Sequence, residues 1–146
     1  MKRVTFAAAA VAAATALCGV VLAQSDAAGD VAAGAQSAQI ERGRYLVHEA
    51  SMCVQCHSPR DRQGDLDESR LLTGGAIPFK APWPGAQRWA FQAPNLRNAL
   101  GYTEQEWVTF LTTGVRPSGD MPRPPMPPYR MTADDAQAIY AYLQSL

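Results

Sequence analysis

The amino-acid sequence predicts an all-α domain in which three main helices are joined by long loops. Two segments near the C-terminus combine a threonine N-cap with apolar residues at helical spacing, and a third segment near residue 40 has the same spacing. The connecting segments are rich in glycine and proline and lack the period-two alternation that is typical of strands. These features favour helices packed with irregular loops.

The N-terminus has the pattern of a secretory signal peptide. Lys2 and Arg3 precede an apolar, alanine-rich run over residues 6–23, and the polar sequence QSD follows this run. Such segments are removed on export and do not belong to the fold. We therefore expect residues 1–23 to be an export signal.

The alternative to a cleaved signal is an uncleaved membrane anchor formed by residues 4–23, which are just long enough to span a bilayer. Val21 and Ala23 are small residues at the positions that favour cleavage after Ala23. Cys18 lies inside the run after the large residue Leu17, so we interpret it as a passive member of the apolar segment. Cleavage predicts a periplasmic protein in an oxidising compartment.

Residues 24–37 are small and polar and predict a flexible spacer, followed by one small domain over residues 38–146. Without the signal segment, eleven basic and thirteen acidic residues give the chain a formal charge of −2. This balance argues against a nucleic-acid-binding protein, which needs a basic surface.

The first helix of the domain is predicted over residues 39–51. Its apolar residues fall at approximately helical spacing: Ile40, Tyr45, Leu46, Val47 and Ala50. Gly43 lies on the same side as Val47 and costs a helix about 1 kcal/mol relative to alanine. Two interpretations stay open: a backbone that crosses closely at Gly43, or a glycine in an exposed turn.

The sequence Cys53-Val54-Gln55-Cys56-His57 follows this helix and forms a C-x-x-C-H motif, the pattern that attaches a haem covalently. Two thiols on one short helical turn can each form a thioether with a vinyl group of the porphyrin, and the next residue can coordinate the iron. We therefore expect one haem c, held covalently by Cys53 and Cys56, with His57 as proximal axial ligand.

Two other sites use similar residues. A thioredoxin-like redox pair would lie beside a strand-helix-strand pattern with apolar strands, and none flanks this motif. A structural zinc site would need about four ligands, whereas the only other histidine is His48. Haem attachment is therefore favoured, and a haem would replace much of the core that a small domain lacks.

Residues 60–102 contain many glycines and prolines and predict a long loop. A connection of this length needs an organising surface, which a haem would supply. We expect one or more of four aromatic residues on the porphyrin edge: Phe79, Trp83, Trp89 and Phe91. The alternative is a satellite cluster away from the haem.

Two capped helices complete the domain. Thr103 and Glu106 form a capping box before an apolar run that ends at Gly114. Thr132 is the N-cap of the C-terminal helix, which begins with two aspartates. Its apolar stripe consists of Ala136, Ile139, Tyr140, Tyr142 and Leu143.

Residues 115–131 between these helices form a proline-rich strap that holds three of the five methionines. Met126 has prolines on both sides and is the favoured second axial ligand, with Met121 as the alternative. Met131 directly precedes the helix cap, where an apolar residue packs on the first turn. His48 or an open position are further alternatives for the iron.

The order of these features resembles a class I c-type cytochrome over residues 39–146. The haem motif and the terminal helix T-A-D-D-A-Q-A-I-Y-A-Y-L-Q-S-L carry most of the resemblance. The strap sequence P-P-M-P-P-Y is similar to that of monohaem domains associated with periplasmic dehydrogenases. The resemblance implies a cytochrome c-like fold wrapped around the haem.

The same resemblance implies that the first and last helices cross closely, so that Gly43 and Tyr45 meet the face of Ile139 and Tyr142. In many class I members a Gly-Pro after the motif supplies a carbonyl to the proximal histidine, but this sequence contains no Gly-Pro. We expect a backbone carbonyl in the region 74–78 to accept that hydrogen bond instead.

Iron with histidine and methionine ligands has no vacant position for substrate, which predicts an electron-transfer protein rather than an enzyme. Its partners would be a periplasmic dehydrogenase and a terminal oxidase or another cytochrome, with the domain as a free carrier or a subunit. The alternative is a haem enzyme or gas sensor with an open distal site, such as a small peroxidase, in which Arg116 or Arg123 could approach the iron.

Overall fold

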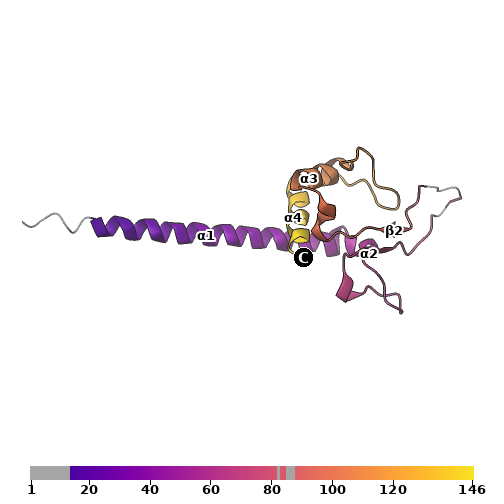
Figure 1. Ribbon diagram of the computed structural model, residues 1–146, viewed down its shortest axis with the longest axis horizontal. Helices are drawn as coiled ribbons and strands as arrows, with labels where there is room; N and C mark the ends of the chain where they lie inside the picture. The colour runs from indigo at the N-terminus through magenta and orange to yellow at the C-terminus, as the bar shows by residue number, and fades with distance from the viewer. Residues whose placement is uncertain (1–13, 82, 85–87) are drawn as a thin grey trace, which may run out of the picture. The chain divides into compact units, whose positions relative to one another are not determined.

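The computed structural model describes residues 14–81, 83–84 and 88–146, with side chains described from residue 29 onward (Figure 1). The chain divides into two units, Met1–Ser37 and Ala38–Leu146. Residues 1–13, the first part of the expected export signal, lie outside the described residues. Among the described helices, none is long and apolar enough to cross a membrane.

Helix α1 spans Ala14–Tyr45. Residues 24–37, for which the sequence predicted a flexible spacer, have helical backbone, and residues 29–37 are exposed. The alanines in this segment supply intrinsic helix propensity. The helix that we expected over 39–51 consists of the last residues of α1 and a π-helical segment, η1 (Leu46–Ala50).

The second unit is mostly helical, as predicted. After η1 come α2 (Cys53–His57), η2 (Glu68–Arg70), η3 (Arg97–Gly101), α3 (Glu104–Thr113) and α4 (Ala133–Gln144). Two short strands that the sequence did not reveal, β1 (Gly75–Ala76) and β2 (Gln92–Ala93), pair antiparallel within the long loop. Each strand has only two residues, too few for an alternation to be visible in the sequence.

Both predicted caps are present. The Thr103 side chain accepts a hydrogen bond from the backbone N–H of Glu106, whose carboxylate accepts one from the backbone N–H of Thr103. At the other end of α3, Gly114 adopts a φ of 72°, a left-handed conformation that suits glycine. The Thr132 hydroxyl accepts from the backbone N–H of Asp135 and begins α4.

The end of α1 crosses α4 at Gly43. A Cβ atom at this position would lie 2.0 Å from the backbone oxygen of Ala138 and 2.7 Å from Cβ of Tyr142. The close-crossing interpretation of Gly43 is therefore confirmed. The expectation for Tyr45 was wrong: its side chain is 47% exposed, and the guanidinium of Arg42 lies 5.6 Å from its ring centroid.

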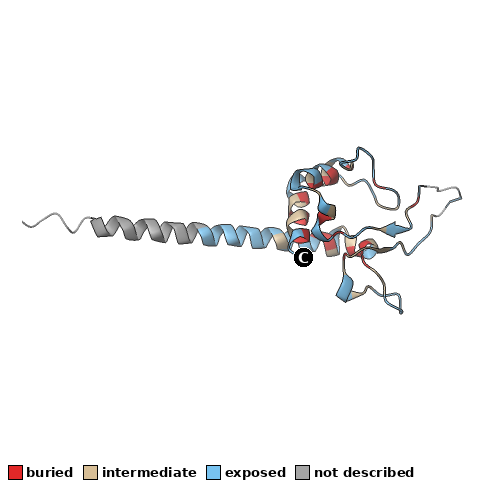
Figure 2. Ribbon diagram, in the orientation of Figure 1, coloured by how far each residue is buried: buried red, intermediate tan, exposed pale blue. Residues whose placement is uncertain are grey.

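The core joins α3 and α4 to the segment before the C-x-x-C-H motif, where buried residues gather in Figure 2. α3 packs against α4, and η3 packs against α4 as well. The predicted stripe of α4 is buried at Ala136, Ile139, Tyr142 and Leu143. The buried residues of α3 in this core are Trp107, Phe110 and Leu111.

His48 links η1 to α4, because its Nε2 lies 2.7 Å from the hydroxyl of Tyr142. Burial and the nearby Arg44 guanidinium lower the pKa of His48 from its ordinary value of 6.5. The unfolded chain therefore takes up this proton more readily than the folded chain when the pH falls below 6.5. The stability that the neutral imidazole provides is complete above that pH.

We predict that the free energy of unfolding decreases as the pH falls from about 7 to about 5, and that the decrease is smaller in His48→Gln. The glutamine cannot take up a proton but can still form a hydrogen bond with Tyr142. Urea unfolding followed by circular dichroism across this range measures both slopes. Equal slopes in the two proteins would contradict the assignment of this pH dependence to His48.

Candidate functional site

Helix α2 presents the C-x-x-C-H motif on a short, well-anchored turn. Val54 is 4% exposed and packs into the core, whereas Gln55 points outward and accepts a hydrogen bond from Arg60. The backbone carbonyl of His57 accepts from the N–H of Gly74 at 2.8 Å, and the hydroxyl of Ser58 accepts from the N–H of Leu72 at 2.9 Å. The long loop thus folds back onto the motif.

The imidazole of His57 is buried and oriented by one hydrogen bond. Its Nδ1 lies 2.8 Å from the backbone oxygen of Pro94, and because a carbonyl only accepts, Nδ1 carries the hydrogen. Burial lowers the pKa of His57, and the bond to Pro94 opposes this effect without reversing it. The neutral imidazole therefore has its lone pair on Nε2, the form that coordinates a metal.

Pro94 replaces the carbonyl that we expected in the region 74–78, so that expectation was wrong. Gly74 uses its N–H toward the backbone of His57 instead. The register of the small sheet pairs Gly75 with Ala93, which carries the next residue, Pro94, to the imidazole. An Ala-Pro sequence is a weak signal, since only this long-range pairing identifies the proline concerned.

The two cysteine side chains are partly buried and form no disulfide. Burial raises the pKa of Cys53 to about 11 and also raises that of Cys56. Both groups are therefore thiols at neutral pH. Protonated thiols are compatible with cysteines that become covalently attached to a group. They differ from the low-pKa thiolate of a redox-active pair.

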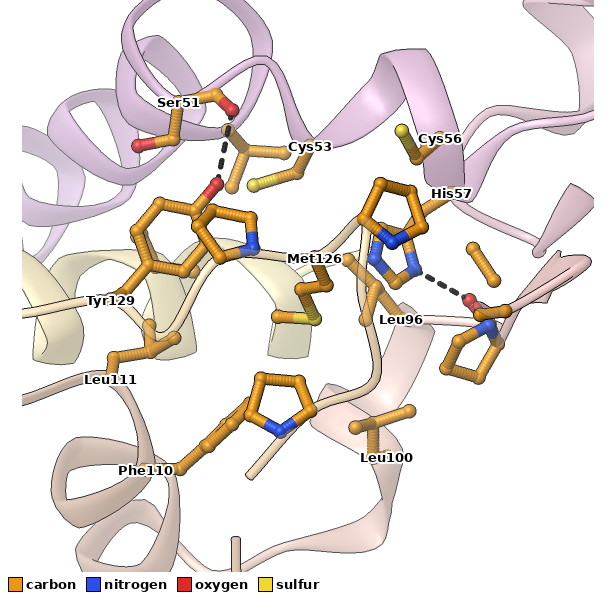
Figure 3. Close-up of a pocket in the computed structure, with 18 of the residues that line it drawn as sticks. Ser51, Cys53, Cys56, His57, Leu96, Leu100, Phe110, Leu111, Met126 and Tyr129 are labelled. Atoms are coloured by element: carbon orange, nitrogen blue, oxygen red, sulfur yellow. Dashed lines mark hydrogen bonds between the residues drawn. The ribbon is translucent and has the colours of Figure 1, made fainter. Parts of the chain in front are cut away.

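A large cavity opens beside the motif, with a volume of about 890 Å³. Figure 3 shows Cys53, Cys56 and His57 on one side of it and Phe110, Leu111 and Leu100 on another. Most of its other lining residues are apolar as well, among them Val47, Leu96, Tyr102, Trp107, Ile139 and Leu143. A cavity of this size and character is suited to a large, flat, mainly apolar group.

The proline-rich strap contributes Met126 to this cavity, where Figure 3 shows its side chain among the lining residues. Met121, the alternative ligand, is 49% exposed and does not line the cavity. Met131 lines the cavity too, but its backbone N–H donates to the carbonyl of Leu111 at 3.0 Å and its side chain packs against the core. Of the two candidates, only Met126 therefore faces His57 across a common space.

One or more of four aromatic residues were expected on the porphyrin edge, and three of the four lie away from the cavity. Phe79 and Trp83 each pack edge-on against Trp89, with ring centroids 6.0 and 5.9 Å apart. None of these three residues lines the cavity, so they form the satellite cluster that was the alternative prediction. Phe91 alone lines it, and its side chain is 76% exposed.

The aromatic wall of the cavity comes instead from α3 and the strap. Tyr102, Trp107 and Phe110 pack together, and Tyr129 donates a hydrogen bond to the carbonyl of Ser51 at 3.3 Å. Burial and the neighbouring cysteines raise the pKa of Tyr129 to about 12. The capping box that predicts α3 could have indicated this wall, because the apolar face of α3 must cover the centre of the domain.

Two buried donors that border the cavity have no hydrogen-bond partner among the described residues: Nε1 of Trp107 and Nε of Arg116. A buried unsatisfied donor costs about 1–3 kcal/mol, so such groups commonly indicate a missing acceptor. One terminal nitrogen of Arg116 donates to the carboxylate of Asp120 and to the carbonyl of Met121. Both donors are therefore available to an acceptor on a group that occupies the cavity.

The remaining candidates have structural contacts. Arg123 lines the cavity, but its guanidinium donates to the carbonyls of Arg88 and Trp89. His48 binds Tyr142 and does not line the cavity. In the described part of the chain, no group of three or more His, Cys, Asp or Glu residues could hold a bare metal ion.

Comparison with known proteins identifies a matching family and several relatives. Residues 38–143 match the family described as "Cytochrome C oxidase, cbb3-type, subunit III". The chain is 34% identical over 122 residues to a nicotinate dehydrogenase subunit of Pseudomonas putida, and the match covers 76% of this chain and 9% of that protein.

Two further relatives show similar levels of identity. The chain is 32% identical to a diheme cytochrome c-type protein of Cereibacter sphaeroides, across 71% of this chain and 34% of that protein. It is 31% identical to the fructose dehydrogenase cytochrome subunit of Gluconobacter japonicus, across 72% of this chain and 21% of that protein. The chain therefore spans at most about a third of the length of these relatives.

Proposed function

The chain belongs to the cytochrome c family described as "Cytochrome C oxidase, cbb3-type, subunit III", and from that premise we propose that it is a periplasmic monohaem electron-transfer protein. The observation that carries the proposal is the presence of Cys53, Cys56, His57 and Met126 on the wall of one apolar cavity. Cys53 and Cys56 would hold one haem c by thioethers, with His57 and Met126 as its axial ligands.

The residues of the cavity fit this group. Its wall offers apolar and aromatic side chains to a porphyrin, and His57 offers a neutral Nε2. The unpaired donors of Trp107 and Arg116 fit the carboxylate ends of a haem, which are acceptors. The buried polar groups and the apolar wall thus support the same occupant.

When bound, the haem supplies a one-electron exchange between ferric and ferrous iron. The protein would contribute ligands in fixed orientations and a site with little exposure to water. Pro94 holds the imidazole of His57 in one tautomer, and burial of this ring at 6% exposure limits its access to water. As an axial ligand, Met126 would favour the reduced state, because a thioether is a weak, neutral ligand. None of these residues has to move a proton, in agreement with a protein that is not itself an enzyme.

Two of the relatives are named as dehydrogenase subunits, which supports a dehydrogenase as the electron donor. A terminal oxidase or another cytochrome would accept the electron. Attachment of haem to two cysteines suits an oxidising compartment, and this supports residues 1–23 as an export signal. Residues 24–37 would then be the spacer and residues 38–146 the cytochrome domain.

The assignment of the sixth ligand can be tested with two methionine variants of the haem-loaded protein. Met126→Leu is expected to lose the weak absorption band of methionine bound to ferric iron and to have a lower reduction potential, since leucine cannot coordinate the metal. Met121→Leu serves as the matched control and is expected to keep both properties, because Met121 is exposed outside the cavity.

Absorption spectra and redox titrations of both variants measure these effects. Loss of the band in Met121→Leu with retention in Met126→Leu would reverse the assignment. Rapid binding of carbon monoxide to the reduced wild-type protein would contradict the electron-transfer proposal, since it requires an open position on the iron.

A further inference from the structure

Arg123 fastens the methionine strap to the loop that precedes β2. Its Nε donates to the carbonyl of Arg88 at 3.1 Å, and a terminal nitrogen donates to the carbonyl of Trp89 at 3.2 Å. Beside it, the backbone N–H of Ala90 donates to the carbonyl of Pro124 at 2.6 Å. The strap is therefore attached to residues 88–90 through positions 123 and 124.

This attachment lies next to Met126 in the chain. The backbone N–H of Met126 donates to the carbonyl of Arg123 at 3.2 Å, so a single turn joins the two residues. Prolines at positions 124, 125 and 127 have no N–H and cannot donate backbone hydrogen bonds. The prolines make the strap stiff, but a few contacts determine where the stiff segment lies.

The other contacts of the strap lie beyond Met126. Tyr129 donates to the carbonyl of Ser51, and the backbone of Met131 donates to Leu111. The segment from Arg123 to Tyr129 is thus held at both ends, with Met126 between them. Arg123 is the charged attachment of the first end, and a planar guanidinium that donates two hydrogen bonds restricts orientation as well as distance.

We infer that Arg123 is a positioning residue that holds the sulfur of Met126 in the cavity by clamping the strap to the carbonyls of Arg88 and Trp89. The inference rests on the proposed function, in which Met126 is the sixth ligand. It also explains why Arg123 borders the cavity without being a distal acid or base: its donors are directed to backbone carbonyls.

Arg130 provides a matched control within the same strap. It is exposed, and its guanidinium donates only to the carbonyls of Pro128 and Tyr129, which are its immediate neighbours in the chain. Removal of this arginine changes the charge of the strap by the same amount as removal of Arg123. The guanidinium of Arg130 also lies beside Gly114 at the end of α3, but among the described residues it forms no hydrogen bond outside the strap.

The test uses the ferric, haem-loaded chain and imidazole as a competitor for the sixth position. Imidazole binds more tightly when the methionine-bound state is weakened, because less of that state must be displaced. Arg123→Gln is expected to increase the apparent affinity for imidazole by about tenfold and to lower the reduction potential. Arg130→Gln is expected to stay within about twofold of wild type.

Arg123→Lys should give an intermediate affinity, since one ammonium replaces the guanidinium fork. Equal imidazole affinities of Arg123→Gln and Arg130→Gln, with a higher affinity in Met126→Leu, would overturn the inference and leave the proposed ligand intact. No increase in Met126→Leu would overturn the ligand assignment and this inference with it. If Arg123→Gln does not accumulate with haem, Arg123→Lys is compared with Arg130→Lys instead. A higher imidazole affinity in Arg123→Lys supports the inference, and equal affinities overturn it.

Discussion

Replacing Cys53 and Cys56 together by alanine is expected to yield a chain that carries no covalent haem and no longer unfolds cooperatively. The cavity beside these residues has a volume of about 890 Å³. At roughly 24 cal/mol per Å³ of unfilled space, leaving it without its occupant costs at most about 21 kcal/mol. Exposed residues such as Phe91 border the cavity, so water enters and reduces this cost. The cost is still comparable with the whole stability of a domain, about 5–15 kcal/mol.

Intact mass, haem absorbance and thermal unfolding followed by circular dichroism measure this result. Gln55→Ala is the control, because Gln55 lies between the two cysteines on α2 with its side chain exposed. It is expected to keep the haem mass and the sharp thermal transition. A cysteine-free chain that unfolds at the same temperature as the wild type would show that the bound group is not needed to fill the domain.

Gly43→Ala is expected to destabilise the domain by about 1–3 kcal/mol or more, because the added methyl overlaps the backbone of α4. The new Cβ would lie 2.0 Å from the oxygen of Ala138, and a backbone atom cannot turn away as a flexible side chain can. Alanine gains about 1 kcal/mol in helix propensity over glycine, which offsets only part of this cost. The backbone of α1 or of α4 must therefore shift at the crossing.

Denaturant unfolding of the haem-loaded protein measures this loss, and Gly34→Ala in the same helix is the control. No atom outside the local helix lies within 4 Å of a Cβ at Gly34, so this substitution is expected to be neutral or slightly stabilising. An equal effect of both substitutions would show that helix propensity, and not the crossing, determines the result.

The caps and stripes of α3 and α4 could be predicted because they depend on neighbours within a few positions. The Thr103 and Glu106 pair, the Thr132 cap and the apolar face of α4 are all confirmed. In both caps the hydrogen-bond partners are three residues apart. The buried face of α4 repeats with the helical period. Helical elements of this kind are visible in the sequence before any tertiary contact is known.

The long loop could not be predicted in the same way. Its prolines and glycines indicate only that it is not a helix, and its two short strands have no period that a sequence could display. Aromatic composition indicated that one or more of Phe79, Trp83, Trp89 and Phe91 would lie at the haem, but it could not show that Phe91 borders the cavity while the other three pack together elsewhere. The aromatic wall comes in part from Trp107 and Phe110 of α3, a segment for which the sequence predicted only a capped, apolar helix.

The sequence by itself determined the helical class, the C-x-x-C-H motif and the short set of methionines that compete for one role, because these depend on residue type and local spacing. Only the tertiary structure decided that Pro94 orients His57, that Met126 and not Met121 enters the cavity, and that Arg123 holds the strap. Each of these contacts joins residues more than thirty positions apart or depends on such a contact. Their partners are selected by how the loops pack, and local spacing carries no information about that packing.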